Sequence, residues 1–332
     1  MQGVVENATP GGCPLVSIVI PCYNAATYIG SAIESALEQT YKNVEVVVVD
    51  DGSRDGSLSV IRGFGSRVVC EASAHRGGGA ARNVGIQLAR GELIQFLDSD
   101  DVLLEGKVAR QVDLILSDKR SSVFGWYEHR YPSGGTETQE FKPPSSLLGD
   151  SVVLALRHII QIEAPLHWTK NVRTLGGFDE KLPCNQDYDF NLRMAASGVR
   201  FVYDGQQSSR NLRREGSVSS DRCRRHRVML DVLSNSRRML EEQGALSEHR
   251  REAIAHLLAS LGRALIGCGE IALAKAAIKL AFDVHPGGGV ATAYDGKSRI
   301  VRTVLGPVLA EYAIGAYQRL GKGKAEKGKT VP

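Results

Sequence analysis

The chain has 332 residues, of which 42% are hydrophobic and 23% are charged, with 36 glycines and 11 prolines. This composition is that of ordinary folded proteins and excludes disordered, collagen-like and coiled-coil chains, and the length allows about two domains. The formal net charge of +4 is too small over this length to indicate a nucleic-acid-binding protein, so we expect no nucleic-acid partner.

Six cysteines are scattered along the chain without a C-x-x-C pair: Cys13, Cys22, Cys70, Cys184, Cys223 and Cys268. This spacing indicates neither a zinc site nor a disulfide framework, and it favours a reducing compartment. The N-terminus lacks the basic and apolar segments of a secretory signal, and no apolar run of 18 residues occurs. We therefore expect a cytoplasmic protein without a transmembrane helix.

Short apolar runs alternate with helical patterns after a flexible leader at residues 1–13. The runs that predict strands are 16–20, 44–49, 68–70 and 93–97, and the helical patterns between them cover 29–37 and 80–89. This alternation predicts an α/β fold with a doubly wound, mostly parallel sheet and helices on both faces. Ligands bind such sheets beyond the carboxyl ends of the strands.

The second half of the chain has a different pattern. A strand is possible over 123–131, and a mixed segment from 165 to 203 contains a short helix over 188–197. Beyond residue 226 the apolar rows have helical spacing only. We expect an α/β domain over 14–225, a smaller helical region over 226–318 and a flexible basic tail over 319–332.

Acidic side chains follow the predicted strand 93–97 directly. Asp98, Asp100 and Asp101 lie within four residues, and carboxylates this close repel one another unless a cation, a helix N-terminus or solvent relieves the repulsion. Mn²⁺ or Mg²⁺, bound together with substrate phosphates, is one interpretation. A helix cap formed by Ser99, Asp100 or Asp101 is the other.

Polar and aromatic residues also follow the first two predicted strands, at 21–24 and 50–53. Tyr23 could stack on a base, and Asp51 could accept hydrogen bonds from a base or a ribose. Each segment alone is typical of a turn. Because the strand ends meet at one edge of the sheet, the segments together favour a nucleotide-diphosphate site. The glycines at 77–79 and Arg82 fit a pyrophosphate or a flexible connection.

A second acidic centre lies at the start of the helix predicted over 188–197. A carboxylate in the first turn of a helix compensates the helix dipole. An ionised aspartate within reach of an acceptor hydroxyl also serves as a general base. Both interpretations apply to Asp187.

Seven arginines crowd the segment 210–227: Arg210, Arg213, Arg214, Arg222, Arg224, Arg225 and Arg227. No aromatic residue lies among them, so the stacking of nucleic-acid bases has no support. Contacts to a diphosphate or to an anionic membrane surface fit these arginines at least as well. The segment 301–320, apolar with few charges, could lie on such a membrane surface or pack within the fold. A peripheral contact with the inner face of the membrane is therefore a hypothesis.

The motifs taken in order resemble those of the family 2 inverting glycosyltransferases of the GT-A fold. The matching segments are VSIVIPCYN at 16–24, QTY at 39–41, VVDDGSRDG at 48–56, AARN at 80–83, ARGE at 89–92, FLDSDD at 96–101, GGFDE at 176–180 and QDYD at 186–189. The resemblance covers residues 14 to 220, and the ordered set is more specific than any single motif.

The resemblance implies transfer of a single sugar from a nucleoside-diphosphate donor, with a UDP-sugar favoured, to a hydroxyl of a saccharide or lipid-linked acceptor. It implies a divalent metal, Mn²⁺ or Mg²⁺, held by Asp100 and Asp98, and Asp187 as the general base. The residues expected to bind the nucleotide sugar are Pro21, Tyr23, Asn24, Asp50, Asp51, Arg82, Asp98, Ser99 and Arg210. The alternative is a catalytically idle partner subunit that binds a nucleotide.

Three departures from the family pattern bear on these expectations. Gln186 stands where many members have Glu, and Arg214 stands where a metal-binding His would fall. Asn211 follows Arg210 where processive synthases have Trp, which favours addition of one sugar over polymerisation. We expect the acceptor to contact the segments 121–149 and 158–172, where Trp126 and Trp168 are each either a sugar platform or a core residue.

Overall fold

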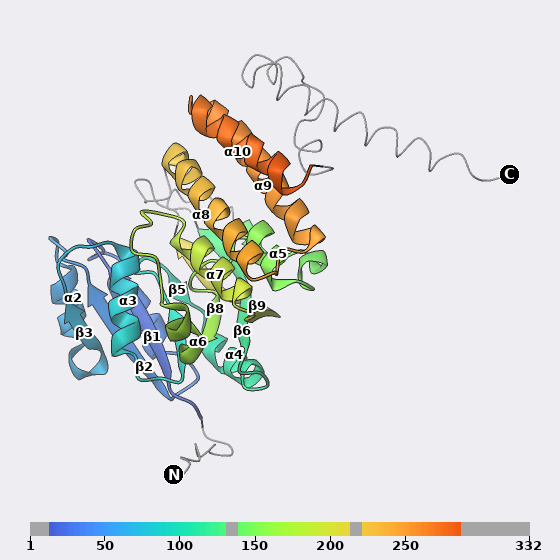
Figure 1. Cartoon of the computed structure of the whole chain (residues 1–332). Helices are drawn as coiled ribbons and strands as arrows, with labels where there is room; N and C mark the ends of the chain where they lie inside the picture. The colour runs from blue at the N-terminus through green and yellow to red at the C-terminus, as the bar shows by residue number, and fades with distance from the viewer. Residues whose placement is uncertain (1–12, 131–138, 213–220, 287–332) are drawn as a thin grey trace, which may run out of the picture. The chain divides into compact units, whose positions relative to one another are not determined.

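The computed structural model describes residues 13–130, 139–212 and 221–286 (Figure 1). The leader up to residue 12, Arg213 and Arg214, the segment 301–320 and the basic tail lie outside these ranges. The chain divides into two compact units. The first unit comprises Met1–Lys142, Gln161–Glu180 and Arg200–Arg213, and the second comprises Pro143–Ile160, Lys181–Val199 and Arg214–Pro332. The expected domain boundary near residue 226 stays a prediction.

A nine-stranded sheet forms the centre of the first unit, with β7 paired to β6 beside the main strand order β3-β2-β1-β4-β8-β6-β9-β5. Its parallel half consists of β1 (Val16–Cys22), β2 (Val44–Asp50), β3 (Val69–Ala72) and β4 (Leu93–Phe96). These are the strands that the apolar runs predict. Every residue of β1 is buried, because a central parallel strand is covered on both faces.

The other half of the sheet is mixed. Its strands are β5 (Val102–Leu103), β6 (Ser121–Arg130), β7 (Gln139–Phe141), β8 (Pro165–Trp168) and β9 (Arg200–Leu212). β8 runs antiparallel between β4 and β6, whereas β6 and β9 are parallel, and β5 and β7 pair antiparallel with β9 and β6. The expected α/β class with a doubly wound sheet is confirmed. The strand direction reverses at β8, which is antiparallel to both of its neighbours.

The helices of the first unit cover both faces of the parallel strands. They are α1 (Ile29–Leu37), α2 (Ser57–Gly63), α3 (Gly78–Leu88), α4 (Lys107–Ile115) and α6 (Thr169–Leu175). Ile18 and Ile20 of β1 share a core cluster with Ile29 and Ile33 of α1. Val19 points the other way, toward α3, where its side chain leaves too little room for a Cβ at Gly85. The period-two alternation of β1 therefore packs helices on opposite faces.

The carboxyl ends of three parallel strands lie toward the same edge of the sheet. Cys22 of β1 pairs with Asp50 of β2, and the amide of Asp51 donates to the carbonyl of Cys22 over 2.8 Å. On the other side of β1, the amide of Leu97 donates to the carbonyl of Val19 over 3.0 Å. The segments that follow these strands thus begin at one edge of the sheet, as the sequence predicts.

The second unit is helical. It contains α5 (Ser151–Arg157), α7 (Gln186–Ala196), α8 (Arg222–Glu242), α9 (Glu248–Gly267) and α10 (Ile271–Val284). Asp150 caps α5, accepting from the amides of Val152 and Val153, and its carboxylate also pairs with Arg250 of α9 at 2.8 Å. A single side chain thereby caps the start of one helix and joins it to another.

The expectation that the cysteines form no disulfide is wrong for one pair. Cys223 in the first turn of α8 is bonded to Cys268 at the end of α9, with 5.7 Å between the Cα atoms. The two cysteines are 45 positions apart in sequence, and the packing of α8 on α9 brings them together. Their sequence spacing therefore does not indicate the pairing. The remaining cysteines are free.

Within the described ranges, no helix has both the length and the apolar character needed to span a bilayer.

Candidate nucleotide and metal site

The loops after β1 and β2 hold each other in place. The Asn24 side-chain oxygen accepts from the Arg54 amide over 2.8 Å, and the Asn24 amide donates to the Ser53 hydroxyl over 3.0 Å. Asn24 has a φ of 49°, a conformation that asparagine tolerates better than most residues. Within the protein, Asn24 therefore has the contacts and the backbone conformation of a turn residue.

Asp50 and Pro21 lie at the same edge and are largely covered. Asp50 is buried and accepts from the Ser53 amide over 3.2 Å. Pro21 is the sixth residue of β1 and pairs with Val49. Both residues shape the strand ends from within the sheet.

Asp51 anchors the segment that leads into α3. Its carboxylate accepts from the amides of Arg76 and Gly77, each over 2.8 Å, and lies 2.8 Å from Nδ1 of His75. The carboxylate is nearly buried. A carboxylate has about four acceptor positions, so it can still accept from a bound base or ribose.

An aromatic platform lies beside Asp51. The Tyr23 and His75 rings are stacked, with 3.9 Å between their centroids and 19° between their planes. Tyr23 is 40% exposed, and in the described part of the chain it is the one aromatic residue among the exposed large hydrophobic residues. A planar base can stack on such a surface, and this role of Tyr23 stays a prediction.

Three carboxylates converge where β4 ends. One oxygen each from Asp98, Asp101 and Glu163 lie within 4.8 Å of one another. Asp101 is held by the Leu212 amide and by the Asn211 side chain, each over 2.8 Å. Asn211 also donates to Glu163, so one amide group bridges two of the acids.

Burial and mutual repulsion make the charge on the three carboxylates costly. Burial first, and then the charges of Glu163 and Asp98, raise the pKa of Asp101 well above its usual range. The ligand atoms on offer are all carboxylate oxygens, which are the donors that Mg²⁺ and Mn²⁺ prefer. The residues present therefore fit a divalent metal.

Sequence reasoning did not find Glu163. This side chain is fully buried, and it precedes β8 between Ile162 and Ala164. A lone acid within an apolar stretch is the sequence signal that could have indicated Glu163. Such an acid is expected to be buried, and a buried carboxylate needs a partner. Its approach to Asp98 depends on the pairing of β8 with β4.

The helix-cap interpretation of residues 99–101 is wrong. The amide of Asp101 donates to the carbonyl of Asp98 over 3.1 Å in a turn, and β5 follows immediately. The next helix, α4, begins only at Lys107, with Gly106 at its N-cap position. Ser99 is buried in this turn.

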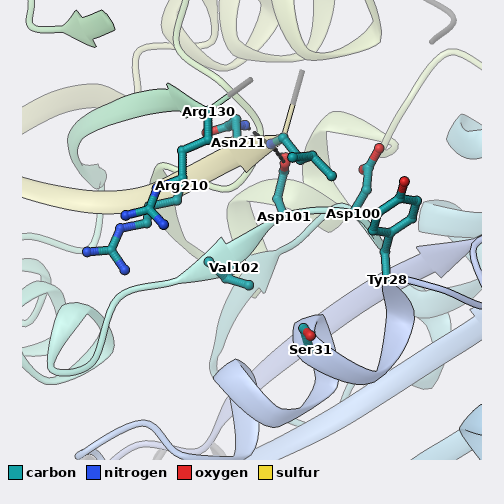
Figure 2. A pocket seen from close by; sticks show the side chains of 9 residues that line it. Tyr28, Ser31, Asp100, Asp101, Val102, Arg130, Arg210 and Asn211 are labelled. Carbon is teal, nitrogen blue, oxygen red and sulfur yellow. Dashed lines mark hydrogen bonds between the residues drawn. The ribbon is translucent and has the colours of Figure 1, made fainter. Parts of the chain in front are cut away.

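Asp100 lines a cavity of about 220 Å³ at the edge of the first unit. Figure 2 shows Asp101 next to Asp100, with the Tyr28 ring beside Asp100. Arg130 and Arg210 line it as well. The cavity thus combines an acidic wall with a basic one.

Arg82 lies on α3 and is nearly buried. It pairs with Asp98 at 2.5 Å and lies over the Phe178 ring, 5.4 Å from the centroid. The neighbouring Asn83 accepts from the Phe178 amide and donates to the Phe178 carbonyl. The AARN and GGFDE segments therefore lie against each other within the first unit.

Asp187 belongs to the second unit and lies in the first turn of α7, as predicted. Its carboxylate accepts from the Tyr188 amide over 2.8 Å. Asn185, with a φ of 57°, is the N-cap residue, and its side chain donates to the Arg225 carbonyl over 2.9 Å. The helix start is thus tied to α8 within the second unit.

The two tryptophans differ in their surroundings. Trp168 is buried and donates from Nε1 to the Asp118 carbonyl over 3.1 Å, so it is a core residue. Trp126 is half-buried, and the Lys142 ammonium lies 4.5 Å from its ring centroid. Of the two, Trp126 is the one that a sugar can reach.

Comparison with known proteins identifies the domain. Residues 17–164 match the family model described as glycosyl transferase family 2. An uncharacterized glycosyltransferase of Rickettsia felis is 38% identical over 185 residues, covering 53% of this chain and 31% of the relative. The UDP-Glc:alpha-D-GlcNAc-diphosphoundecaprenol beta-1,3-glucosyltransferase WfaP of Escherichia coli is 39% identical over 119 residues, covering 35% of this chain and 46% of that relative. The chain thus spans less than half the length of either.

Solved structures share the fold over most of the chain. TarS 1–349 of S. aureus in complex with UDP has a TM-score of 0.61 at 17% identity, covering 93% of this chain and 92% of that one. The mannosyltransferase PcManGT of Pyrobaculum calidifontis, in complex with GDP-Man and Mn²⁺, has a TM-score of 0.57 at 21% identity, covering 92% and 87%. Residues 17–164 therefore match the family 2 glycosyltransferases, and the likeness to the solved structures shows the GT-A fold.

Proposed function

We propose that this protein is an inverting glycosyltransferase that moves a single sugar from a nucleoside-diphosphate donor to a hydroxyl of a saccharide or lipid-linked acceptor. The observation that carries the proposal is the cluster of Asp98, Asp101 and Glu163 at the end of β4, in the same unit as Asp51 and the Tyr23–His75 stack. Such a unit offers a metal site and a base platform to one ligand.

Each predicted residue has a role in this proposal. Tyr23 stacks on the base and Asp51 accepts from the base or ribose, with Pro21, Asn24, Asp50 and Ser99 shaping their loops. Asp98 and Asp100 would hold Mn²⁺ or Mg²⁺, with Asp101 and Glu163 completing the acidic cluster, and such a metal would neutralise charge on the diphosphate. Arg82 and Arg210 add positive charge for the same leaving group.

The proposed reaction is a single displacement. Asp187 takes the proton of the acceptor hydroxyl as its oxygen bonds to the anomeric carbon. The bond from that carbon to the diphosphate breaks on the opposite face, so the configuration inverts. The nucleoside diphosphate leaves with the electron pair.

The relatives support a UDP-sugar as the donor. TarS structures are described with UDP and with UDP-GlcNAc, and the E. coli relative is named for UDP-Glc. PcManGT is described with GDP-Man, which makes a GDP-sugar the competing donor. The diphosphoundecaprenol in the name of the E. coli relative supports a lipid-linked acceptor.

Sugar transfer itself tests the proposal. We expect the full chain with Mn²⁺ to release UDP from UDP-glucose or UDP-GlcNAc faster when a GlcNAc-diphospholipid acceptor is added. The product should carry the new sugar in the configuration opposite to that of the donor. Nucleotide binding without release or transfer from any UDP- or GDP-sugar would instead favour the catalytically idle subunit.

Peripheral membrane contact is part of the same proposal, because a lipid-linked acceptor lies in a membrane. Its support among the described residues is the basic start of α8, which carries Arg222, Arg224, Arg225 and Arg227. We expect the protein to cosediment with anionic phosphatidylglycerol vesicles at low salt and not with neutral phosphatidylcholine vesicles. Equal recovery in both pellets would contradict this contact.

A further inference from the structure

Two arginines share one buried carboxylate at the basic wall of the cavity. Arg210 of β9 donates from Nε to Oε1 of Glu128 over 2.8 Å, and Arg130 at the end of β6 donates from Nε to the same oxygen over 3.1 Å. The strand register explains the meeting, since Glu128 and Arg210 are paired residues of the parallel strands β6 and β9. Figure 2 shows the guanidinium groups of Arg130 and Arg210 on the same side of the cavity.

The charges at this wall do not balance. Two guanidinium groups meet one carboxylate, which leaves a net charge of about +1 at neutral pH. Among the described residues, Glu128 is the only carboxylate that pairs with either arginine, and the terminal nitrogens of Arg130 and Arg210 donate no hydrogen bond. The side chains are 54% and 39% exposed, so these nitrogens can reach a ligand.

The donor geometry suits a phosphate-class anion. By engaging Nε, Glu128 fixes both guanidinium planes and leaves their terminal donors for a second partner. Planar guanidinium forks match the oxygens of phosphate groups, and two forks side by side match a group with several charged oxygens. The cavity of about 220 Å³ has room for such a group and for a neutral portion near Tyr28 and Ser31.

The wall is separate from the platform proposed for the nucleoside. The cavity is lined by Asp100, Asp101 and Arg130 together with residues of α1, β5 and β9. Neither Tyr23, Asp51 nor Arg82 lines it. In the strand order, β1 and β2 lie on one side of β4, whereas β6, β9 and β5 lie on the other. A ligand on Arg130 and Arg210 would therefore contact strands on the other side of β4 from the strands that carry the base platform.

We propose that Arg130 and Arg210, oriented by Glu128, form a binding site for a phosphate-class anion in this cavity. That the anion belongs to a substrate rests on the proposed function. Two sources share this chemistry, namely a phosphate carried by the acceptor and the diphosphate of the donor.

The test is titration of inorganic pyrophosphate into the full chain in EDTA at low salt, so that no metal held by the acidic cluster can bind the probe. We expect Arg130→Gln and Arg210→Gln each to weaken binding about tenfold, since each removes a charged donor pair. Glu128→Gln keeps the shape and removes the opposing charge, so it should tighten binding several-fold.

Arg200→Gln is the matched control. Arg200 lies at the other end of β9, opposite Ser121, and also pairs with a carboxylate, that of Asp118 at 2.6 Å. Its replacement should change pyrophosphate affinity less than twofold. Equal affinities of the wild type, Arg130→Gln and Arg210→Gln, or no pyrophosphate binding by the wild type, would overturn the site.

Titration of UDP with Mn²⁺ into the same variants separates the two sources. A tenfold loss of UDP affinity in Arg130→Gln and Arg210→Gln assigns the site to the donor diphosphate. Unchanged UDP affinity assigns it to an acceptor phosphate. If the arginines bind pyrophosphate but the wild type binds no nucleotide, the site stands and the proposed function fails.

Discussion

Replacement of Asp187 by asparagine is expected to lower kcat by about 10²- to 10⁴-fold, the range that a positioned general base contributes. The Kd for UDP with Mn²⁺ should stay within about twofold, because the base acts on the acceptor hydroxyl and not on the nucleotide. Asparagine can still accept from the Tyr188 amide, so the first turn of α7 should remain formed. Steady-state kinetics and nucleotide titration on one preparation measure both quantities.

Asp189 provides the matched control for this variant. It lies two residues further along α7, is nearly buried, and pairs with Arg193 at 2.8 Å. Asp189→Asn should lower thermal stability while leaving kcat within a few-fold of the wild type, because Asp189 has a partner within its own helix. An Asp187→Asn enzyme with wild-type kcat would contradict the role of Asp187 as the base.

Replacement of Asp100 by alanine is expected to weaken metal-dependent UDP binding by about 100-fold or more, because the diphosphate loses the cation that offsets its charge. Binding measured in EDTA should be as weak in the variant as in the wild type. Asp100 is a cleaner probe than Asp101, whose carboxylate also holds the Leu212 amide and the Asn211 side chain.

Asp118→Asn is the control for Asp100→Ala. Asp118 is an acid of the same unit, and its ion pair with Arg200 lies at the start of β9, away from the carboxyl end of β4. Its replacement should leave metal-dependent UDP binding unchanged. Retention of that binding by Asp100→Ala would mean that Asp98, Asp101 and Glu163 hold the metal without Asp100.

The parallel half of the sheet could be predicted because its signals are local. Buried parallel strands are apolar runs such as 44–49, and a turn segment that begins with Asp51 ends the second of them. The aromatic and acidic residues of the site follow those strands directly. That these residues lie close together could therefore be predicted from the rule that parallel strands end at one edge of the sheet.

The rest depends on contacts between distant segments. Glu163 reaches Asp98 only because β8 pairs antiparallel with β4, and Arg210 reaches Glu128 only through the register of β9 with β6. β9 itself contains Gly205 and several polar residues, so its sequence lacks the apolar pattern of a strand. The disulfide between Cys223 and Cys268 likewise follows from helix packing.

Calorimetric titration of the full chain with UDP, GDP and dTDP, first with Mn²⁺ and then with EDTA, tests the central claim most directly. We predict that UDP binds with Mn²⁺, that GDP and dTDP bind more weakly, and that EDTA abolishes the binding. Absence of binding by all three nucleotides in the presence of Mn²⁺ would contradict a nucleotide-sugar site in this domain.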